Sequence, residues 1–295
     1  MNFRFVQYGG ISYPDGIKPE LVEVAGHLDK DSIENYPKYS LHTEYSYGKR
    51  NLCSRLVSMY SALKEANRDS VPQLWKSKEW SEQFADFILN LTENHEAPVV
   101  IEIHPPFSDY CDLEIFLERY SIFEKRIHNS YPDTEIVVEN RAGTVYRGGK
   151  FIIGKATEIA LLCKMIQETN TALGVVLDFP QLLTAENIRP EAFDHDKYKV
   201  AIDLICPYRD TIKGIHIWGK KKNAKGRWIA HNGNLDTLFE NPDDKEAFIF
   251  GIRKICSDGK LRFFVPEVNS GESDLKAVVR DVLGIYTEIN NSSPT

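Results

Sequence analysis

Six apolar runs along this 295-residue chain end in side chains that can bind a divalent cation. In chain order these residues are His42, His104, Glu139, Asp178, His216 and Glu267. Imidazole nitrogens and carboxylate oxygens are common ligands of zinc, manganese and cobalt. Burying three carboxylates among three imidazoles without a cation would leave like charges unbalanced. A lone histidine at such a position is more often a core or capping residue, but six residues in register predict a metal centre.

The runs that end in these residues are typical of buried parallel strands, because most of them are too apolar to have a solvated face. Seven strands are predicted, over Arg4–Tyr8, Ser40–Tyr45, Pro98–His104, Glu135–Asn140, Leu173–Asp178, Lys213–Trp218 and Phe263–Glu267. Leu21–Ala25 is a weaker eighth candidate.

Segments with apolar residues three and four positions apart alternate with the strands and predict helices. They cover Leu52–Asn67, Trp80–Thr92, Leu113–Asn129, Lys155–Thr169, Asp196–Ile205, Lys245–Cys256 and Ser273–Ile289. No glycine-rich fingerprint follows the first strand, so the alternation favours an α/β fold of the closed (β/α)8 TIM barrel type over a doubly wound sheet. In such barrels the active site lies at the carboxyl ends of the strands, which places the six residues at one mouth.

The composition of the chain is that of an ordinary globular protein. Hydrophobic residues make up 42% and charged residues 27%, which excludes a disordered chain. The net charge of −7 excludes general attraction to polyanions, so any such contact must be local. We expect one domain over residues 1–295 with a flexible tail from about 288 to 295, and a cytoplasmic protein with no membrane partner. The five cysteines form no C-x-x-C pair, which argues against a disulfide framework or a zinc ribbon.

The most specific motif follows the fourth of the seven stronger strand candidates. Glu139-Asn140-Arg141-Ala142-Gly143 resembles the Glu-Asn-x-Ala-Gly of the endonuclease IV-like proteins (AP endonuclease family 2) among the xylose isomerase-like TIM barrels. His42-Thr43-Glu44-Tyr45 resembles their His-x-x-Tyr, and His104-Pro105 resembles their His-Pro. The resemblance spans residues 40 to 270.

This resemblance implies two zinc ions per chain and a hydrolase. One ion would be held by His42, His104 and Glu139, and the second by Glu139, Asp178, His216 and Glu267, with Glu139 bridging. Glu139 and Glu267 would then be catalytic. The reaction implied is hydrolysis of a phosphodiester at an abasic-like or otherwise exposed nucleotide, as in DNA repair, with both ions stabilising the entering and leaving oxygens.

The chain departs from the family pattern at two positions. Gln181 and Ile229 stand where the family has ligands of a third metal, so no third ion is expected. A basic loop, Lys220 to Arg227, has five cations in eight residues and is the local patch suited to phosphate. Candidate phosphate or substrate contacts are Lys220, Lys222, Arg141, Gln181, Trp218 and His231, with Trp218 and Trp228 able to stack on a base. A solvated charged loop is the plainer interpretation, and nucleic acid is the partner if the loop binds one.

Other residues near the strand ends carry less information. Glu102 stands two positions before His104 and should face the same side of its strand, as a hydrogen-bonding partner of a ligand. Arg141 either neutralises a carboxylate or makes a loop salt bridge. His27 has no supporting context and is expected at the surface.

Two alternatives to the hydrolase remain. The first is a sugar isomerase or epimerase acting on a small sugar or sugar phosphate, in which Glu139, Asp178, His216 and Glu267 hold one manganese, magnesium or cobalt ion. His42 and His104 would then have no metal to bind. The second is a barrel that binds metal or ligand without turnover. Substrate identity, oligomeric state and the role of residues 48–97 stay open.

Overall fold

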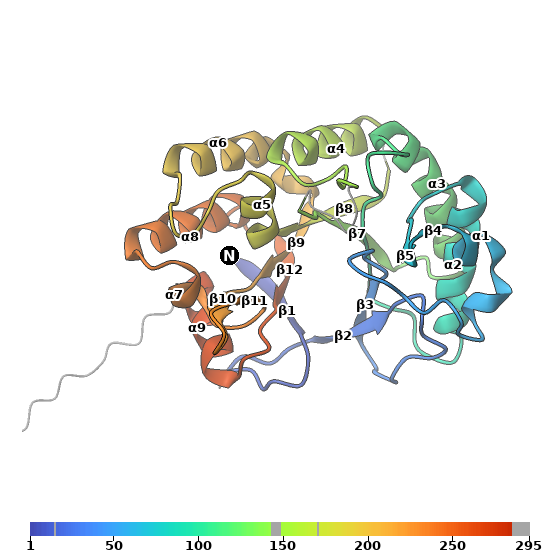
Figure 1. Ribbon diagram of the computed structural model, residues 1–295, viewed down its shortest axis with the longest axis horizontal. Coiled ribbons are helices and arrows are strands. Elements are labelled where there is room, and N and C mark those ends of the chain that lie inside the picture. Colours follow the sequence, from blue (N-terminus) through green and yellow to red (C-terminus); the bar gives the residue numbers. More distant parts are fainter. Residues whose placement is uncertain (15, 143–148, 170, 285–295) are drawn as a thin grey trace, which may run out of the picture.

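Eight parallel strands close into a barrel with helices around it in the computed structural model (Figure 1). The structure describes residues 1–14, 16–142, 149–169 and 171–284. The strands follow the order β1-β12-β9-β8-β7-β6-β3-β2. Their bounds are β1 (Asn2–Gln7), β2 (Leu21–Gly26), β3 (Tyr39–Thr43), β6 (Val100–Ile103), β7 (Glu135–Glu139), β8 (Leu173–Asp178), β9 (Ile212–Ile217) and β12 (Leu261–Pro266). The predicted (β/α)8 barrel and its eight strands are confirmed.

The two-residue period of each strand divides the apolar residues into two cores. Alternate residues such as Ile101 and Ile103 of β6 pack outward in the large core under the helices. The others, including Val100 of β6 and Val137 of β7, fill the inside of the barrel. Because Glu102 and His104 share the period of Val100, they continue this inner row toward the mouth. The polar residues at the carboxyl ends of the strands therefore form a layer at the barrel mouth, above the apolar residues that fill the inside of the barrel.

Seven α-helices of 7 to 18 residues lie around the barrel. They are α2 (Lys78–Leu91), α3 (Leu113–Ser130), α4 (Ala156–Thr169), α5 (Phe179–Ala185), α6 (His195–Ile205), α8 (Pro242–Cys256) and α9 (Glu272–Leu283). Side chains cap several amino ends: Ser77 accepts from the Trp80 amide and Asp112 from the Ile115 amide. The expected helix to Ile289 is described only as far as Leu283, and residues 285–289 lie outside the described part, as do the expected tail 288–295 and Gly143 of the motif.

The helix predicted over Leu52–Asn67 is wrong. This segment contains only a short 3₁₀ turn, η1 (Val57–Met59), and a five-residue helix, α1 (Ser61–Glu65), separated by the extended Tyr60. Polar groups outside the apolar pattern explain the break, because the Asp31 carboxylate accepts the Leu56 amide and the Ser54 hydroxyl accepts the Val57 amide. The strand pair β4 (Asn67–Arg68) and β5 (Val71–Pro72) follows directly.

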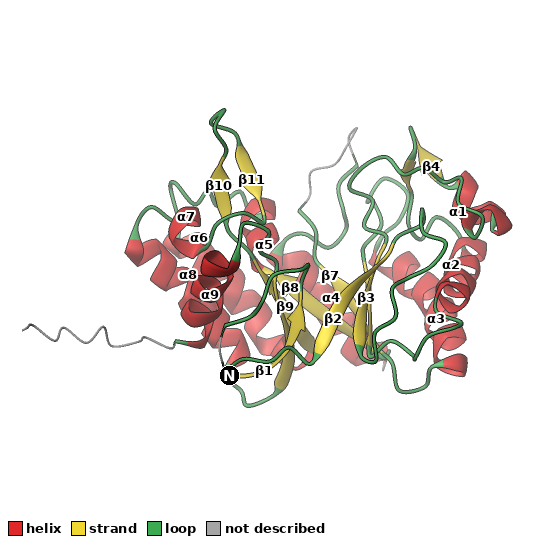
Figure 2. Cartoon of the chain, turned by 90° about the horizontal axis from the view of Figure 1, so that it is seen from below, coloured by secondary structure: helices red, strands yellow, loops and turns green. Residues whose placement is uncertain are grey.

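Two hairpins stand at the carboxyl ends of the barrel strands (Figure 2). One is β4 with β5. The other joins β10 (Lys220–Lys222) to β11 (Trp228–Ala230) and is the expected basic loop. It is followed by α7 (Leu235–Leu238), and η3 (Cys206–Thr211) precedes β9. In the part of the chain that is described, no helix combines the length and apolar character needed to cross a bilayer.

Candidate metal centre

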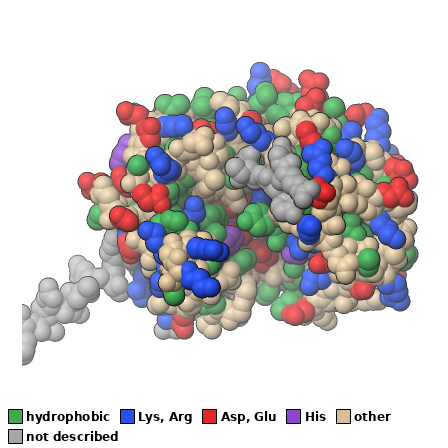
Figure 3. All heavy atoms as spheres, viewed as in Figure 1, with side chains coloured by type: hydrophobic (Ala, Val, Ile, Leu, Met, Phe, Trp, Pro, Cys, Tyr) green, Lys and Arg blue, Asp and Glu red, His purple; other side chains and the backbone are tan. Residues whose placement is uncertain are grey.

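All six predicted ligands lie at the carboxyl ends of the barrel strands, around the mouth. Five of them, His104, Glu139, Asp178, His216 and Glu267, are at most 4% exposed, and His42 is partly exposed. Figure 3 looks onto this mouth and shows histidine and acidic side chains in the hollow, with the lysine and arginine side chains of the β10–β11 hairpin at its rim.

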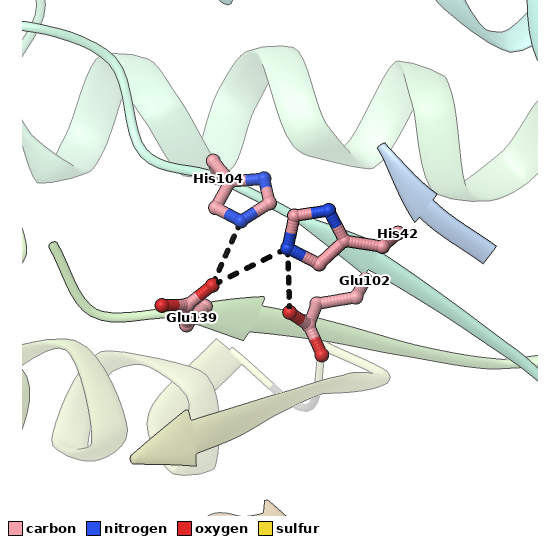
Figure 4. Close-up of side chains that lie close together, drawn as sticks. All are labelled: His42, Glu102, His104 and Glu139. Carbon is pink, nitrogen blue, oxygen red and sulfur yellow. Dashed lines mark hydrogen bonds and ion pairs between the residues drawn. The ribbon is translucent and has the colours of Figure 1, made fainter. Parts of the chain in front are cut away.

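One group of possible ligands consists of His42, Glu102, His104 and Glu139 (Figure 4). His42 Nε2 lies 3.4 Å from Glu102 Oε1 and 3.7 Å from Glu139 Oε2. His104 Nε2 lies 2.9 Å from the same Glu139 oxygen. Donors bound to one zinc ion at 2.0–2.2 Å lie roughly 3.3–3.6 Å apart in tetrahedral geometry. The 3.4 Å spacing lies in this range and the 3.7 Å spacing close to it, whereas the 2.9 Å contact between His104 and Glu139 would have to lengthen around a common cation.

A second group consists of Glu139, Asp178 and His216, so Glu139 belongs to both. Glu267 Oε1 lies 3.3 Å from His216 Nδ1, which brings the sixth predicted ligand beside this group. Glu102 Oε2 lies 3.2 Å from His216 Nε2 and therefore stands between the two groups. The Asp178–His216 pairing follows from the sheet register, in which these two residues are direct neighbours on β8 and β9.

Several buried polar atoms in this pocket have no hydrogen-bond partner among the described residues. They are both ring nitrogens of His216, Glu102 Oε1 and Glu267 Oε2. Buried polar atoms in folded proteins are nearly always paired with protein, water or an ion. These four atoms are possible metal ligands, so the donor set fits divalent cations, whereas Arg141 Nε beside Glu139 also lacks a hydrogen-bond partner in the described part of the chain and cannot bind a cation.

The surroundings of His104 fit a bound cation. Its Nδ1 faces the Glu44 carbonyl oxygen at 3.2 Å, and a carbonyl can only accept, so Nδ1 carries the proton. Burial lowers the pKa of His104 to about 4, which keeps the imidazole neutral. Nε2, the nitrogen on the other side of the ring, lies 2.9 Å from Glu139 Oε2, so a cation bound by both atoms would take the place of the direct contact between them.

The charges around His42 and Glu139 favour cation binding as well. Burial alone would lower the pKa of His42, yet the Glu139 and Glu23 carboxylates raise it to about 9. Burial would raise the pKa of Glu139, yet the His104 and His42 imidazoles hold it well below its usual range. The Arg141 guanidinium, 3.7 Å from Glu139 Oε1, acts in the same direction. Glu139 is therefore ionised at neutral pH and available as a ligand.

The surroundings of Asp178 and His216 favour the protonated form of both side chains. Burial, and then the charges of Glu139 and Glu267, raise the pKa of Asp178 well above its usual range. Burial would lower the pKa of His216, yet Glu102 and Glu267 raise it well above the ordinary value. A divalent cation would displace these protons, so its binding should release protons to solvent.

The backbone and neighbouring side chains hold Asp178 in place. Its Oδ1 accepts the Gln181 amide at the start of α5, and its Oδ2 accepts the Trp218 indole N–H, both at 2.8 Å. Asn140 bonds both the amide and the carbonyl of Asp178 across the two strands. The Gln181 side chain in turn accepts the Ala142 amide, which ties the turn after β7 to α5. Gln181 thus holds the rim of the site together.

Trp218 is placed differently from the sequence expectation. It is buried, and its ring stacks on the His231 imidazole with centroids 4.8 Å apart, so its face is covered by the protein itself. His231 has a positive φ of 60° and returns from the hairpin to the pocket, where its Nδ1 lies 3.6 Å from Glu267 Oε2. Its Nδ1 also lies 3.4 Å from the Tyr8 hydroxyl. Lys220 and Lys222 stay on the hairpin, outside the pocket.

Two residues of the pocket were not predicted. Glu23 on β2 faces the ligands, and burial raises its pKa to about 7. The signal was present, since Glu23 is the one charged residue of Leu21–Ala25 and shares the inward period of Leu21. His27, expected at the surface, instead lies half-buried beside His42 with ring centroids 6.1 Å apart, and burial lowers its pKa to about 2. No sequence pattern marks His27, because it follows its strand in an irregular turn.

No protein-family model matches the chain, and no curated protein matches it in sequence. Among solved structures, a chain described as AsfvAP:AG has a TM-score of 0.46 and 10% identity, covering 83% of this chain and 84% of that one. Citrobacter amalonaticus methylaspartate ammonia lyase has a TM-score of 0.36 and 8% identity, covering 84% of this chain and 41% of the lyase. An oxaloacetate acetylhydrolase has a TM-score of 0.31 and 10% identity, covering 77% and 68%. Similarities this distant carry no argument about function.

Proposed function

We propose that this chain is a divalent-metal-dependent enzyme, a phosphodiesterase that binds two zinc ions and acts on an abasic-like or exposed nucleotide. The observation that carries the proposal is the position of Glu139 in both ligand groups. His42, Glu102 and His104 with Glu139 would hold one ion. Asp178, His216 and Glu267 with Glu139 would hold the other. A carboxylate shared between two buried ligand groups is the arrangement expected of a two-metal hydrolase.

The bound ions would lower the pKa of a coordinated water and neutralise charge that develops on the phosphate. The protein side chains have separate tasks. Glu139 and Glu267 would hold the ions, and Arg141, 3.7 Å from Glu139 Oε1, would offer its guanidinium to a phosphate oxygen. His231 is positioned by Trp218 and Glu267 to hydrogen-bond the leaving oxygen. This role would compensate for Gln181 and Ile229, which stand where the family resemblance has third-site ligands.

The sugar isomerase alternative is supported less well by the geometry. That alternative uses one ion and leaves His42 and His104 without a ligand role. Both histidines, however, converge on Glu139 Oε2, with Nε2 of His42 at 3.7 Å and Nε2 of His104 at 2.9 Å. Residues that only packed the barrel would not need to bring two imidazoles onto one carboxylate oxygen.

Metal stoichiometry and hydrolysis together test the proposal. The protein should be purified without chelator and its metal content measured by elemental mass spectrometry, alongside a His42→Ala variant. We expect about two zinc ions per chain, falling to about one in the variant, and metal-dependent cleavage of DNA that contains an abasic-site analogue. His95→Ala, outside the site, is the control and should keep both ions.

Three results would contradict the proposal. A single manganese, magnesium or cobalt ion that is unaffected by His42→Ala, with sugar isomerisation, would establish the alternative. Two ions without cleavage of any phosphodiester would indicate a barrel that binds metal without turnover. No bound metal at all would remove the role assigned to the six residues.

A further inference from the structure

A groove of about 530 Å³ opens beside the mouth, between α5 with its following turn and the β10–β11 hairpin. Its volume lies within the range of pockets that bind small molecules, about 300–1,000 Å³. Figures 1 and 2 both place α5 and the hairpin on the same side of the barrel. The residues used below are among those that line it: Pro180, Arg189, Glu191, Lys220 and Trp228.

The groove is joined to the candidate metal centre through short stretches of chain. Pro180, on its α5 side, is two residues after Asp178. Lys220, on its hairpin side, is two residues after Trp218, whose indole N–H donates to Asp178. Asp178 is therefore connected to both walls of the groove, to one through the chain and to the other through the hydrogen bond from Trp218. The groove thus lies beside the candidate metal centre.

The hairpin presents one chemically distinct face to the groove. The strand register pairs Lys220 with Ala230 and Lys222 with Trp228, so these four side chains share a face, while Lys221 and Ile229 share the other. Trp228 is 39% exposed, and the Lys222 ammonium lies over one face of its ring, 4.7 Å from the centroid. An exposed indole with a cation beside it is a surface on which a nucleic-acid base can stack.

The groove is also locally basic on an acidic protein. Lys220 and Arg189 line it, and neither forms an ion pair with any residue that the structure describes. Glu191 is the acidic side chain among its lining residues and offers an acceptor to a base amino group. Since the chain as a whole carries a net charge of −7, two unneutralised cations beside an exposed indole favour one class of ligand, a phosphate joined to an aromatic base.

We propose that this groove binds the nucleotide next to the reacting one in a single-stranded stretch of nucleic acid. The base stacks on Trp228, and the flanking phosphate is held by Lys220 and Arg189. The inference rests on the proposed phosphodiesterase function and adds to it a preference for a polynucleotide strand over a small phosphodiester.

Strand binding by the full-length protein in EDTA tests the groove without cleavage. The probe is a fluorescein-labelled twelve-residue oligothymidylate, and its affinity is measured by anisotropy at several salt concentrations. Trp228→Ala should weaken binding roughly 5- to 150-fold, which corresponds to the loss of one stacked base, with no change in salt dependence. Lys220→Ala should lower the slope of log affinity against log salt by about 0.7, as expected for one phosphate contact on a single strand.

Lys221→Ala is the matched control, since it removes the same charge from the opposite face of the same hairpin. It should leave affinity and salt slope unchanged. If Lys221→Ala weakens binding as much as Lys220→Ala, the hairpin attracts strands without using the groove, and the inference is wrong. It is also wrong if Trp228→Ala changes affinity less than twofold or if the wild-type protein does not bind the probe. Far-UV circular dichroism confirms that each variant is folded.

A second assay separates failure of the groove from failure of the proposed function. The zinc-loaded protein is tested on bis(p-nitrophenyl) phosphate, which is too small to occupy both the metal centre and the groove, and on the oligothymidylate. We expect Trp228→Ala to reduce kcat/KM for the strand and to leave the small diester unchanged. Cleavage of both substrates with no effect of Trp228→Ala overturns the groove alone. Absence of cleavage of either by the wild-type protein overturns the proposed function, and the anisotropy data then still decide whether the groove binds a strand.

Discussion

Replacing Glu139 with glutamine should weaken both metal sites at once. Glu139 is the one residue common to the group with His42, Glu102 and His104 and to the group with Asp178 and His216. The substitution preserves side-chain volume and removes the negative charge, so the change in packing is small. An effect on both sites would thus report ligand loss.

The size of the effect follows from the number of donors. Four-donor structural zinc sites bind with about 10–16 kcal/mol, or about 2.5–4 kcal/mol per donor. Loss of one donor from each group should therefore lower each zinc affinity by roughly 10²- to 10³-fold. Asp178→Asn removes a donor from the second group alone, so it should weaken one site by the same factor and leave the other unchanged.

The assay is a competition titration of zinc against a chromogenic chelator at constant pH, which resolves two affinities when they differ. Wild-type, Glu139→Gln and Asp178→Asn proteins are compared, and thermal unfolding in EDTA verifies that each is folded. If Glu139→Gln weakens only one site and leaves the other within threefold, Glu139 is not shared and the two-metal arrangement is refuted. Equal weakening of both sites by Asp178→Asn would refute the division of the ligands into two groups.

Three further predictions concern protons, positioning and stability. The pKa of His42 is raised to about 9, and a protonated imidazole cannot bind metal, so zinc affinity should rise with pH from 6 to 9. Calorimetry in two buffers should detect the protons released on binding, and a zinc affinity independent of pH would contradict this prediction. Trp218→Phe keeps the ring but removes the N–H bonded to Asp178, so it should weaken the second site about 10- to 100-fold, whereas Trp228→Phe should not. Asp258→Asn should cost about 3 kcal/mol at pH 7, because Asp258 is the bidentate partner of the buried Arg262. Hydrogen bonding to Arg262 lowers the pKa of Asp258, so its contribution is present above about pH 4 and is lost on further acidification; urea unfolding should show this loss in the wild-type protein and not in the variant.

The barrel could be predicted from the sequence because short apolar strands alternate regularly with segments whose apolar residues have helical spacing. Each strand is short and apolar, and each turn follows at a polar residue, so even the weak candidate Leu21–Ala25 corresponds to β2. The predicted helix over Leu52–Asn67 failed for a different reason. Whether a helix forms there depends on Asp31, more than twenty residues away, because its carboxylate accepts the Leu56 amide. No local sequence pattern reveals this hydrogen bond.

The site could be predicted at the level of strand ends and not at the level of contacts. The inward period places Glu102 beneath His104, but the register across the barrel was needed to bring Glu102 between His42 and His216. Trp218 shows the same limit. Its position in a basic loop favoured contact with substrate, whereas its indole N–H is used by Asp178 and its ring face by His231.

Closure of the barrel by β1 and β12 links metal binding to folding. The first strand pairs with the last, and Glu267 follows that last strand directly, more than 220 residues after His42. A fragment that ends before Glu267 lacks one of the six ligands, and a fragment without β1 lacks the strand that pairs with both β12 and β2. Contacts so distant in sequence form slowly. Zinc should therefore bind the unfolded chain poorly and stabilise those molecules in which the barrel has closed. At a free zinc concentration one hundred times the dissociation constant, each site would add about 2.7 kcal/mol to the stability of the closed barrel.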